Sequence, residues 1–201
     1  LQDQIASQRI AESLVYNAFN FVDVNTIVIM APTFFPLTDN SSETTMLAFA
    51  GDILGHEMYH SFVTEALLNR SAEFRSEASC IQRHYNESCK MFAETNCNSG
   101  VKTFSEDGVD VEGLRAAYEL LKQEYTESEL KEFEYVDLNI TREQSFFYSV
   151  AMRSCMEIKG RKYDEHSPDN VRVNALVSQM PEFSKAFECQ EDDELYAHPV
   201  G

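Results

Sequence analysis

The stretch Gly55-His56-Glu57-Met58-Tyr59-His60 decides how the rest of the sequence is interpreted. It lies within residues 43–67, where apolar side chains recur at helical spacing and predict a long helix. Side chains four residues apart lie on the same side of a helix, so the imidazoles of His56 and His60 can bind one zinc ion. Glu57 can then reach a metal-bound water as a general base. Two surface histidines without a metal are the alternative, because so short a motif also arises by chance.

A second pair of metal-compatible side chains lies in the stretch FSEDGVD, residues 104–110, which opens a helix predicted to run to residue 121. A catalytic zinc ion has three protein ligands and one open position. Glu106 and Asp110 are four residues apart, so both carboxylates face one side. We expect Glu106 to be the third ligand and Asp110 to accept a hydrogen bond from the far nitrogen of a ligand imidazole. The alternative is that these acids only complement the helix dipole.

The remaining elements are predicted from periodicity and turn residues. The β-branched stretch VDVNTIVIM, residues 22–30, predicts one strand, which Pro32 and Pro36 end. A polar, acidic linker is expected after residue 121, and Thr141 is a favourable N-cap for the helix that follows. Gly108 and Gly113 should weaken their helix by about 1 kcal/mol each relative to alanine. Further helices are predicted over residues 1–19, 72–92, 142–158, 172–179 and 181–188.

The composition is that of one globular, strongly acidic domain. The 201 residues are 43% hydrophobic and carry a formal net charge of -18. A surface this acidic repels phosphate groups, which argues against nucleic acid as a partner. It also disfavours anionic membrane surfaces. No run of apolar residues is long enough to span a membrane, so we expect no transmembrane segment in this chain.

Two features of the sequence indicate an extracellular protein. Four Asn-x-Ser/Thr sequons occur, at Asn40, Asn69, Asn86 and Asn139. Three of the five cysteines cluster, as disulfide-forming cysteines of secreted proteins often do; the five are Cys80, Cys89, Cys97, Cys155 and Cys189. An odd number of cysteines and the lack of a signal peptide suggest a fragment of a longer protein. We expect a secreted protein or the ectodomain of a membrane-anchored parent.

Several motifs, in order, resemble those of the neprilysin family of zinc metallopeptidases. GHEMYH (55–60) followed by SEDGVDVEGLRAAY (105–118) is similar to the catalytic core of that family. YNAFN (16–20), followed by NTIVIMAPTFF (25–35), resembles its substrate-binding edge strand. DEHSPDNVRVN (164–174) and MPEFSKAFEC (180–189) resemble its His-Ser-Pro turn and its closing segment. The resemblance covers residues from about 14 to 189.

The resemblance implies a mainly α fold with a small β edge sheet, like the thermolysin-like (gluzincin) catalytic lobe of this family. Residues 1–42 would form the substrate edge-strand region, residues 43–125 the zinc-site helices, and residues 126–201 the C-terminal helices with the His-Ser-Pro turn. The family's larger, N-terminal helical lobe would be a missing partner. Cys155 and Cys189 would then be unpaired here, and we expect one disulfide among Cys80, Cys89 and Cys97.

The resemblance also implies roles for individual residues around one zinc ion. Asn17 and Ala18 would hold an extended peptide against the edge strand. His166 would donate a hydrogen bond to the oxyanion of the tetrahedral intermediate, and Asp164 would orient that imidazole. Arg172 would bind a substrate carbonyl. The implied function is zinc-dependent hydrolysis of internal bonds in short peptides, with Glu57 as the general base.

The chain departs from the family pattern next to the proposed ligands. Tyr59 replaces a threonine, Ser61, Val63 and Thr64 replace Gly, Asp and Asp, and Asp107 replaces an asparagine; the chain has no tryptophan. These changes leave the ligands and the base intact but alter their surroundings. The alternative function is therefore that of a degenerate family member that binds a peptide or a protein with little turnover.

Overall fold

The computed structural model describes residues 17–63, 71–92, 102–154, 166–193 and 195–196. The described chain is mainly helical with two small antiparallel sheets, as the resemblance implied. The helices are α2 (Glu43–Tyr59), α4 (Ala72–Phe92), α5 (Phe104–Glu124), α6 (Glu127–Leu130), α7 (Arg142–Met152), α8 (Asp169–Val177) and α9 (Pro181–Ala186). The strands are β1 (Ala18–Phe21), β2 (Thr26–Ile29), β3 (Phe133–Tyr135) and β4 (Ile140–Thr141). None of the described helices is long and apolar enough to cross a membrane.

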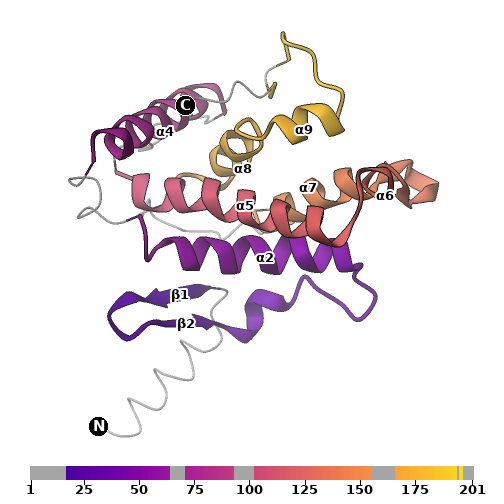
Figure 1. Ribbon diagram of the computed structural model, residues 1–201, viewed down its shortest axis with the longest axis horizontal. Helices are drawn as coiled ribbons and strands as arrows, with labels where there is room; N and C mark the ends of the chain where they lie inside the picture. Colours follow the sequence, from indigo (N-terminus) through magenta and orange to yellow (C-terminus); the bar gives the residue numbers. More distant parts are fainter. Residues whose placement is uncertain (1–16, 64–70, 93–101, 155–165, 194, 197–201) are drawn as a thin grey trace, which may run out of the picture.

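Helix α5 lies at the centre of the molecule. Figure 1 shows α2 and then the β1–β2 hairpin on one side of α5, and α4 and α8 on the other side. The core is formed where α5 meets α4, α7 and α8, and its largest fully buried side chains include Tyr85, Leu114, Leu121, Phe146 and Phe147. Burying each such side chain stabilises the fold by about 1.5–3 kcal/mol. This packing fixes α5 as a rigid support for the acids near its N-terminus.

Helices α2 and α5 cross in direct backbone contact. A Cβ atom added to Gly113 would lie 2.6 Å from the backbone nitrogen of His56, and one added to Gly55 would lie 2.9 Å from the Cα atom of Gly113. These distances are too short for any side chain, so glycine is required at both positions. From helix propensity alone, Gly113 is only a weakness in its helix. The structure gives the reason for it, because the close crossing brings the acids of α5 beside the histidines of α2.

The strand predicted over residues 22–30 is confirmed only for Thr26–Ile29, and its first half is wrong. The chain forms a hairpin in which Ala18 pairs with Ile29 and Phe21 with Thr26. Between the strands is a 3-10 turn, Val22–Val24, closed by Asn25 with φ 48°. Asparagine adopts this left-handed conformation at low cost, so the turn falls inside the β-branched stretch. The helix predicted over residues 1–19 is also wrong at its end, since Ala18 and Phe19 are in β1; residues 1–16 lie outside the described part.

A second hairpin occupies part of the stretch that was predicted to be a linker. Strands β3 and β4 are joined by a 3-10 turn, Val136–Leu138, which ends at Asn139 with φ 53°. The sequences VDVN and VDLN thus form the same turn in both hairpins. Helix α6 precedes the second hairpin and begins with a capping box between Thr126 and Glu129. Neither element was predicted, because the acidic composition of this stretch is typical of a linker.

The other helices agree with the sequence analysis except at their ends. The Ser42 side chain caps α2, which ends at Tyr59 rather than at residue 67; His60 is its C-cap. Thr141 caps α7, as predicted, in a capping box with Gln144. Helix α8 begins at Asp169, three residues before the predicted start, directly after Pro168. Most of the predicted extension of α7 lies outside the described residues.

The cysteines are described only in part. Cys80 and Cys189 are free thiols. Cys89 is in a disulfide, and its partner is not among the residues that the structure describes. Cys97 and Cys155 also lie outside that part, so the pairing expected among Cys80, Cys89 and Cys97 stays a prediction.

Candidate metal centre

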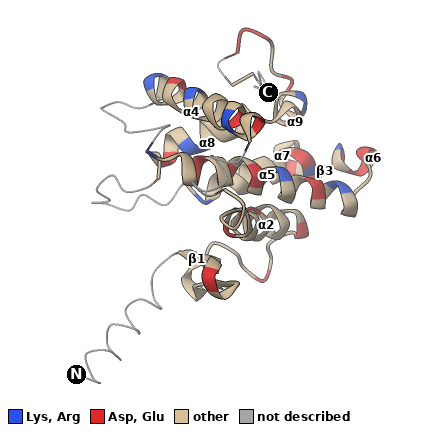
Figure 2. Ribbon diagram, turned by 60° about the vertical axis from the view of Figure 1, so that its left-hand side comes forward, with Lys and Arg blue, Asp and Glu red and all other residues tan. Residues whose placement is uncertain are grey.

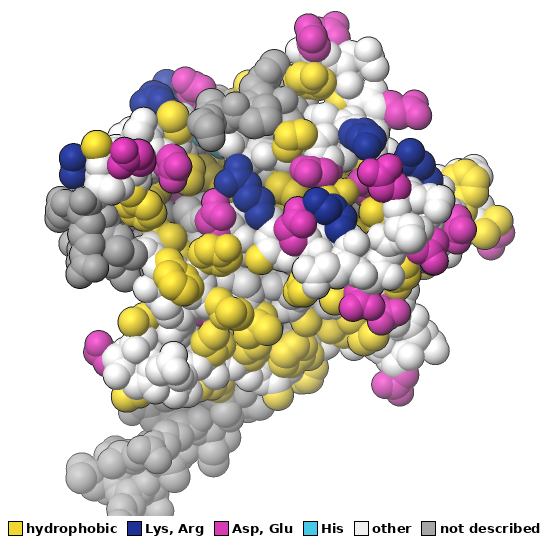
Figure 3. Space-filling model, in the orientation of Figure 1, with side chains coloured by type: hydrophobic (Ala, Val, Ile, Leu, Met, Phe, Trp, Pro, Cys, Tyr) yellow, Lys and Arg dark blue, Asp and Glu magenta, His cyan; other side chains and the backbone are white. Residues whose placement is uncertain are grey.

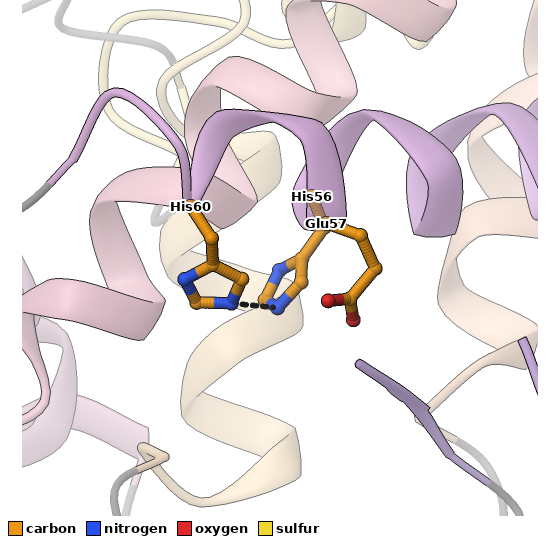
Figure 4. A group of neighbouring side chains, drawn as sticks. All are labelled: His56, Glu57 and His60. Carbon is orange, nitrogen blue, oxygen red and sulfur yellow. Dashed lines mark hydrogen bonds between the residues drawn. The ribbon is translucent and has the colours of Figure 1, made fainter. Parts of the chain in front are cut away.

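Three potential ligand atoms converge where the C-terminal end of α2 faces the first turn of α5. The Nε2 atoms of His56 and His60 are 3.2 Å apart. Oε2 of Glu106 lies 3.2 Å from Nε2 of His56 and 3.4 Å from Nε2 of His60. Figure 4 shows both imidazoles and the carboxylate of Glu57 on the same side of α2. The helical spacing and the glycine crossing together produce this cluster.

The spacing of these atoms fits one zinc ion. Ligand atoms that each lie about 2.0–2.1 Å from a tetrahedral zinc ion are about 3.3–3.5 Å from one another. The three observed separations are close to this value. Glu106 supports the fit, because its Oε2 atom is buried and accepts no well-aligned hydrogen bond from the described residues. Burial alone would raise the pKa of Glu106, but the three surrounding imidazoles outweigh it and hold this pKa well below its usual range.

Asp110 fixes the orientation of His56. Its Oδ1 atom lies 2.7 Å from Nδ1 of His56, and Asp110 is fully buried. An ionised carboxylate only accepts, so Nδ1 of His56 carries the proton and Nε2 presents its lone pair toward Glu106. Burial works against ionisation of Asp110, but Arg172 and Arg153 keep its pKa well below the ordinary value. The imidazole is thereby held in the tautomer that can bind a metal ion.

Glu57 lies beside the ligand atoms in a partly dry environment. A cavity opens beside these atoms, and the side chains of Glu57, His56, His60 and Glu106 line it. Glu57 is only 6% exposed. Burial raises the pKa of Glu57, although the two neighbouring imidazoles lower it. A carboxylate with a raised pKa is a stronger base at neutral pH. The side-chain amide of Asn20 donates to the backbone carbonyl of Glu57 and so ties the β1–β2 hairpin to α2.

A buried ion network surrounds Asp110. Arg172 donates to Asp110 from Nε and from Nη2, each at 2.7 Å. Arg153 contacts Asp110 through Nη2 and Asp52 through Nη1, each at 2.8 Å. The resemblance implied that Arg172 binds a substrate carbonyl; in the structure its guanidinium lines the cavity but is already paired with Asp110. Arg153 and Asp52 were missed, although Asp52 lies one helical turn before His56 and could have been found from that spacing.

His166 approaches Glu106 and the two histidines of α2 from the turn before α8. Its Nε2 atom is 3.1 Å from Oε2 of Glu106, and its ring stacks at 14° to the ring of His56, 6.5 Å away. Oγ of the next residue, Ser167, lies 3.1 Å from Asp107 Oδ2 and 3.1 Å from Thr103 Oγ1. Asp107, which replaces an asparagine in the family pattern, therefore anchors the turn that carries His166. Asp164 lies outside the described residues.

The edge strand lines the same cavity, which has a volume of about 470 Å³. Asn17 and Ala18 are both on its wall. The Asn17 side-chain oxygen accepts from the backbone N–H of Ala18 at 3.0 Å, and the Asn17 backbone N–H donates to Thr33 Oγ1 at 3.1 Å. The Asn17 carbonyl accepts from Met30 N, toward β2. The Ala18 N–H is therefore not used in the sheet, and the Asn17 side chain accepts it at the open edge. The buried Thr33, a further residue that the sequence analysis missed, fixes the start of this strand.

The arrangement of α2, α5 and the β1–β2 hairpin is that of the thermolysin-like zinc metallopeptidases. The profile of Peptidase family M13 matches residues 17–200, and the chain belongs to this family, to which neprilysin-like metallopeptidases also belong.

Relatives and solved structures agree with this assignment. The chain is 29% identical over 197 residues to neprilysin-3 of Drosophila melanogaster, a match that covers 87% of this chain and 24% of that relative. It is 26% identical over 211 residues to neprilysin of Homo sapiens, with 94% and 28% covered. Among solved structures, the zinc metalloprotease Zmp1 of Mycobacterium tuberculosis superposes with a TM-score of 0.71 at 22% identity, over 93% of this chain and 32% of that one. The Haemonchus galactose-containing glycoprotein complex has a TM-score of 0.70 at 25% identity, over 90% and 34%.

These matches cover only a small part of each relative's length. The chain spans about a quarter of the length of these two curated relatives. What the longer proteins do as a whole therefore applies to this chain only as a proposal.

Proposed function

We propose that this chain carries the active site of a zinc-dependent endopeptidase that hydrolyses internal bonds of short peptides. His56, His60 and Glu106 would hold one zinc ion. The observation that carries this proposal is the separation of the three ligand atoms, 3.2, 3.2 and 3.4 Å, which fits a tetrahedral ion with one position left open. When bound, zinc supplies Lewis acidity and makes a water molecule easier to deprotonate.

The protein side chains have separate tasks in this mechanism. Glu57 takes a proton from the attacking water, which its buried position beside the cluster favours. Asp110 keeps the Nε2 lone pair of His56 directed at the metal position. His166 donates an N–H to the substrate oxygen as negative charge develops on it. Asn17 and Ala18 hold the peptide backbone along the open edge of β1. Asp164 would orient His166, and Arg172, held by Asp110, would reach a substrate carbonyl.

Glu57→Gln tests this proposal. The variant keeps all three ligands, so one zinc ion per chain should remain bound. Turnover should fall about 10²–10⁴-fold, because the general base is lost. The measurements are zinc content and digestion of a diverse peptide library, with and without a chelator, on the protein in the length in which it is naturally produced. Cleavage that survives chelation, or full activity of Glu57→Gln, would contradict the proposal.

A second candidate function is that of a zinc-containing binding protein with little turnover. The observation that favours it is His166, whose Nε2 atom is as close to Glu106 as the two ligand histidines are. If His166 were a fourth ligand, the site would be closed, as in structural zinc sites. His166→Ala separates the two candidates. An oxyanion donor lost there should lower turnover about 10²–10³-fold without changing zinc affinity. A lost ligand would instead weaken zinc binding.

We further propose that the protein acts outside the cell, on peptide substrates, together with an N-terminal part of a longer polypeptide. The support is the set of exposed sequons, the disulfide at Cys89 and the partial coverage of the relatives. No nucleic-acid partner is expected for a chain with a net charge of -18.

A further inference from the structure

Arg153 is a charged side chain on the cavity wall to which the mechanism above gives no contact with the substrate. Arg153 is the C-cap residue of α7, and its guanidinium lies where the end of that helix meets α2 and α5. It lines the cavity that also contains His56, Glu57 and Glu106. Its side chain is 13% exposed, so it is largely removed from bulk water but still reaches the cavity surface. A positive group in this place contacts whatever fills the cavity.

The protein satisfies only part of the hydrogen-bonding capacity of Arg153. A guanidinium has five N–H groups. Nη1 contacts Asp52 and Nη2 contacts Asp110, each at 2.8 Å. Among the residues that the structure describes, the Nε–H and the second N–H of each terminal nitrogen have no acceptor. Because the side chain reaches the cavity surface, these N–H groups can donate to water or to an acceptor on a ligand.

The position of Arg153 indicates which side chains of a bound peptide it can contact. It shares Asp110 with His56, a proposed metal ligand, so only one carboxylate separates it from the metal centre. The side chains of a peptide that can reach it are those next to the bond being cleaved. We propose that Arg153 selects a substrate residue, adjacent to the scissile bond, whose side chain ends in a carboxylate or carboxamide oxygen, with the carboxylate preferred. This inference rests on the function proposed above and names its substrate class.

The preference follows from hydrogen bonding more than from net charge. Asp52, Asp110, Arg153 and Arg172 carry two negative and two positive charges, so the network as a whole attracts neither sign strongly. A carboxylate can accept two N–H groups of one guanidinium side by side, and a carboxamide oxygen can accept from them more weakly. An aliphatic side chain would displace water from Arg153 without replacing its hydrogen bonds. Sites built around such donors discriminate strongly against ligands that lack the acceptor.

Three peptides that differ only in the residue next to the scissile bond test the inference. Glu, Gln and Met have side chains of similar length, and each is placed on either side of the bond in turn. We expect kcat/KM to be at least about tenfold higher for the Glu peptide than for the Met peptide, with Gln between them. The assay is run at 0.15 M salt or above, since the net charge of -18 repels acidic peptides at long range.

The variant removes Asp52 and Arg153 together. Asp52→Leu combined with Arg153→Met leaves no unpaired buried charge, which would otherwise destabilise the fold. Arg172 still pairs with Asp110 in this variant. The matched control is Glu112→Leu combined with Arg115→Met, which removes an exposed ion pair of the same 2.8 Å length that does not line the cavity. Zinc content and thermal stability are measured for all three proteins.

The inference holds if the double variant loses the Glu-over-Met preference while the control keeps it. Equal cleavage of the three peptides by the wild type, or a preference that persists in the double variant, would overturn it and leave the peptidase function standing. If the wild type cleaves none of the peptides, the proposed function fails instead. The dissociation constants of the same peptides then decide the inference. Tighter binding of the Glu peptide, lost in the double variant, supports selection by Arg153, and equal binding overturns it.

Discussion

At the scale of single residues, Asp107 is an acid in a buried position where the family pattern has an asparagine. The residue is fully buried, directly beside the proposed ligand Glu106. Burial raises the pKa of Asp107 to about 7, against the opposing hydrogen bond from Thr103. Its neighbours Thr103 and Ser167 are hydroxyl donors, which a neutral amide oxygen could equally satisfy. The acid therefore carries a cost at neutral pH that an amide would avoid.

This cost gives a pH-dependent prediction for Asp107→Asn. Between about pH 4 and pH 7 the unfolded chain has released the proton of Asp107 while the folded protein retains it, so the wild type loses stability as the pH rises. The variant lacks this loss. Without metal, Asp107→Asn should match the wild type near pH 4 and exceed it at pH 8, by about 4 kcal/mol at most. Urea unfolding at a series of pH values measures the difference. Asp137→Asn, in an exposed turn, is the control, and a constant difference at all pH values would refute the explanation.

At the scale of elements, the crossing of α2 and α5 decides whether the site can form. The two histidines come from one helix and Glu106 from the other, so the separation of the helix axes sets the ligand distances. Gly55 and Gly113 make that separation small. Helix propensity alone would favour alanine at Gly113, and the cost of glycine is repaid by the contact that it permits.

Gly113→Ala should therefore damage both stability and metal binding. The added methyl group meets the backbone of His56, which cannot move without shifting α2. We expect a loss of about 1–3 kcal/mol in the free energy of unfolding and weaker zinc binding, because Glu106 moves away from the histidines. Gly108→Ala is the control on the same helix, since its methyl group would meet only side chains, at 3.4 Å. Chemical denaturation and zinc titration compare the two variants. Equal behaviour of both would show that the crossing is not the constraint.

The sequence predicted the helices that carry the site better than the elements around it. Helical spacing and capping residues located α2, α4, α5 and α7, because those signals are local. The turns at Asn25 and Asn139 were missed, since an asparagine inside a β-branched or acidic stretch gives only a weak signal. The pairing of Arg153 with Asp52 could not be predicted, because it joins residues about a hundred positions apart through tertiary packing. Local periodicity indicates which side chains share a helix face but not which helices meet.

At the scale of the whole molecule, the positions of the sequons bear on the proposed extracellular location. In the part of the chain that the structure describes, Figure 2 shows acidic and basic residues distributed over many elements. The sequon residues Asn40, Asn86 and Asn139 are exposed, and Asn69 lies outside the described residues. Asn139 is in the turn of the β3–β4 hairpin, where a glycan would extend into solvent.

We predict that Asn40, Asn86 and Asn139 carry N-linked glycans when the protein is made in a secretory pathway. Changing any one of these asparagines to aspartate should remove one glycan. The electrophoretic mobility should then shift by one of the steps that endoglycosidase treatment also removes. Aspartate is chosen because it tolerates the left-handed conformation of Asn139, so the turn is kept. Electrophoresis and mass spectrometry of the secreted protein measure the result. If all three variants run as the wild type does, the extracellular assignment loses this support.

The last feature at this scale is an apolar surface on α2. Met46, Leu54 and Met58 lie along one side of the helix and are 45%, 43% and 51% exposed. Figure 3 shows apolar side chains gathered over α2. Neighbouring exposed apolar side chains can mark a contact with another part of a protein. It is the surface that we expect another part of a longer polypeptide to cover.

Leu54→Lys tests this expectation against Leu120→Lys on α5, where the native leucine is 44% exposed and so nearly matched. In the 201-residue chain, Leu54→Lys should reduce self-association and dye binding, because it breaks the apolar surface. In the longer natural polypeptide it should instead lower stability, since a charge would be buried against the covering part. Leu120→Lys should have little effect in that longer protein. Sedimentation and thermal unfolding of both lengths make the comparison. If Leu54→Lys is as harmless as Leu120→Lys in the longer polypeptide, this side of α2 stays open to solvent and the covering part lies elsewhere.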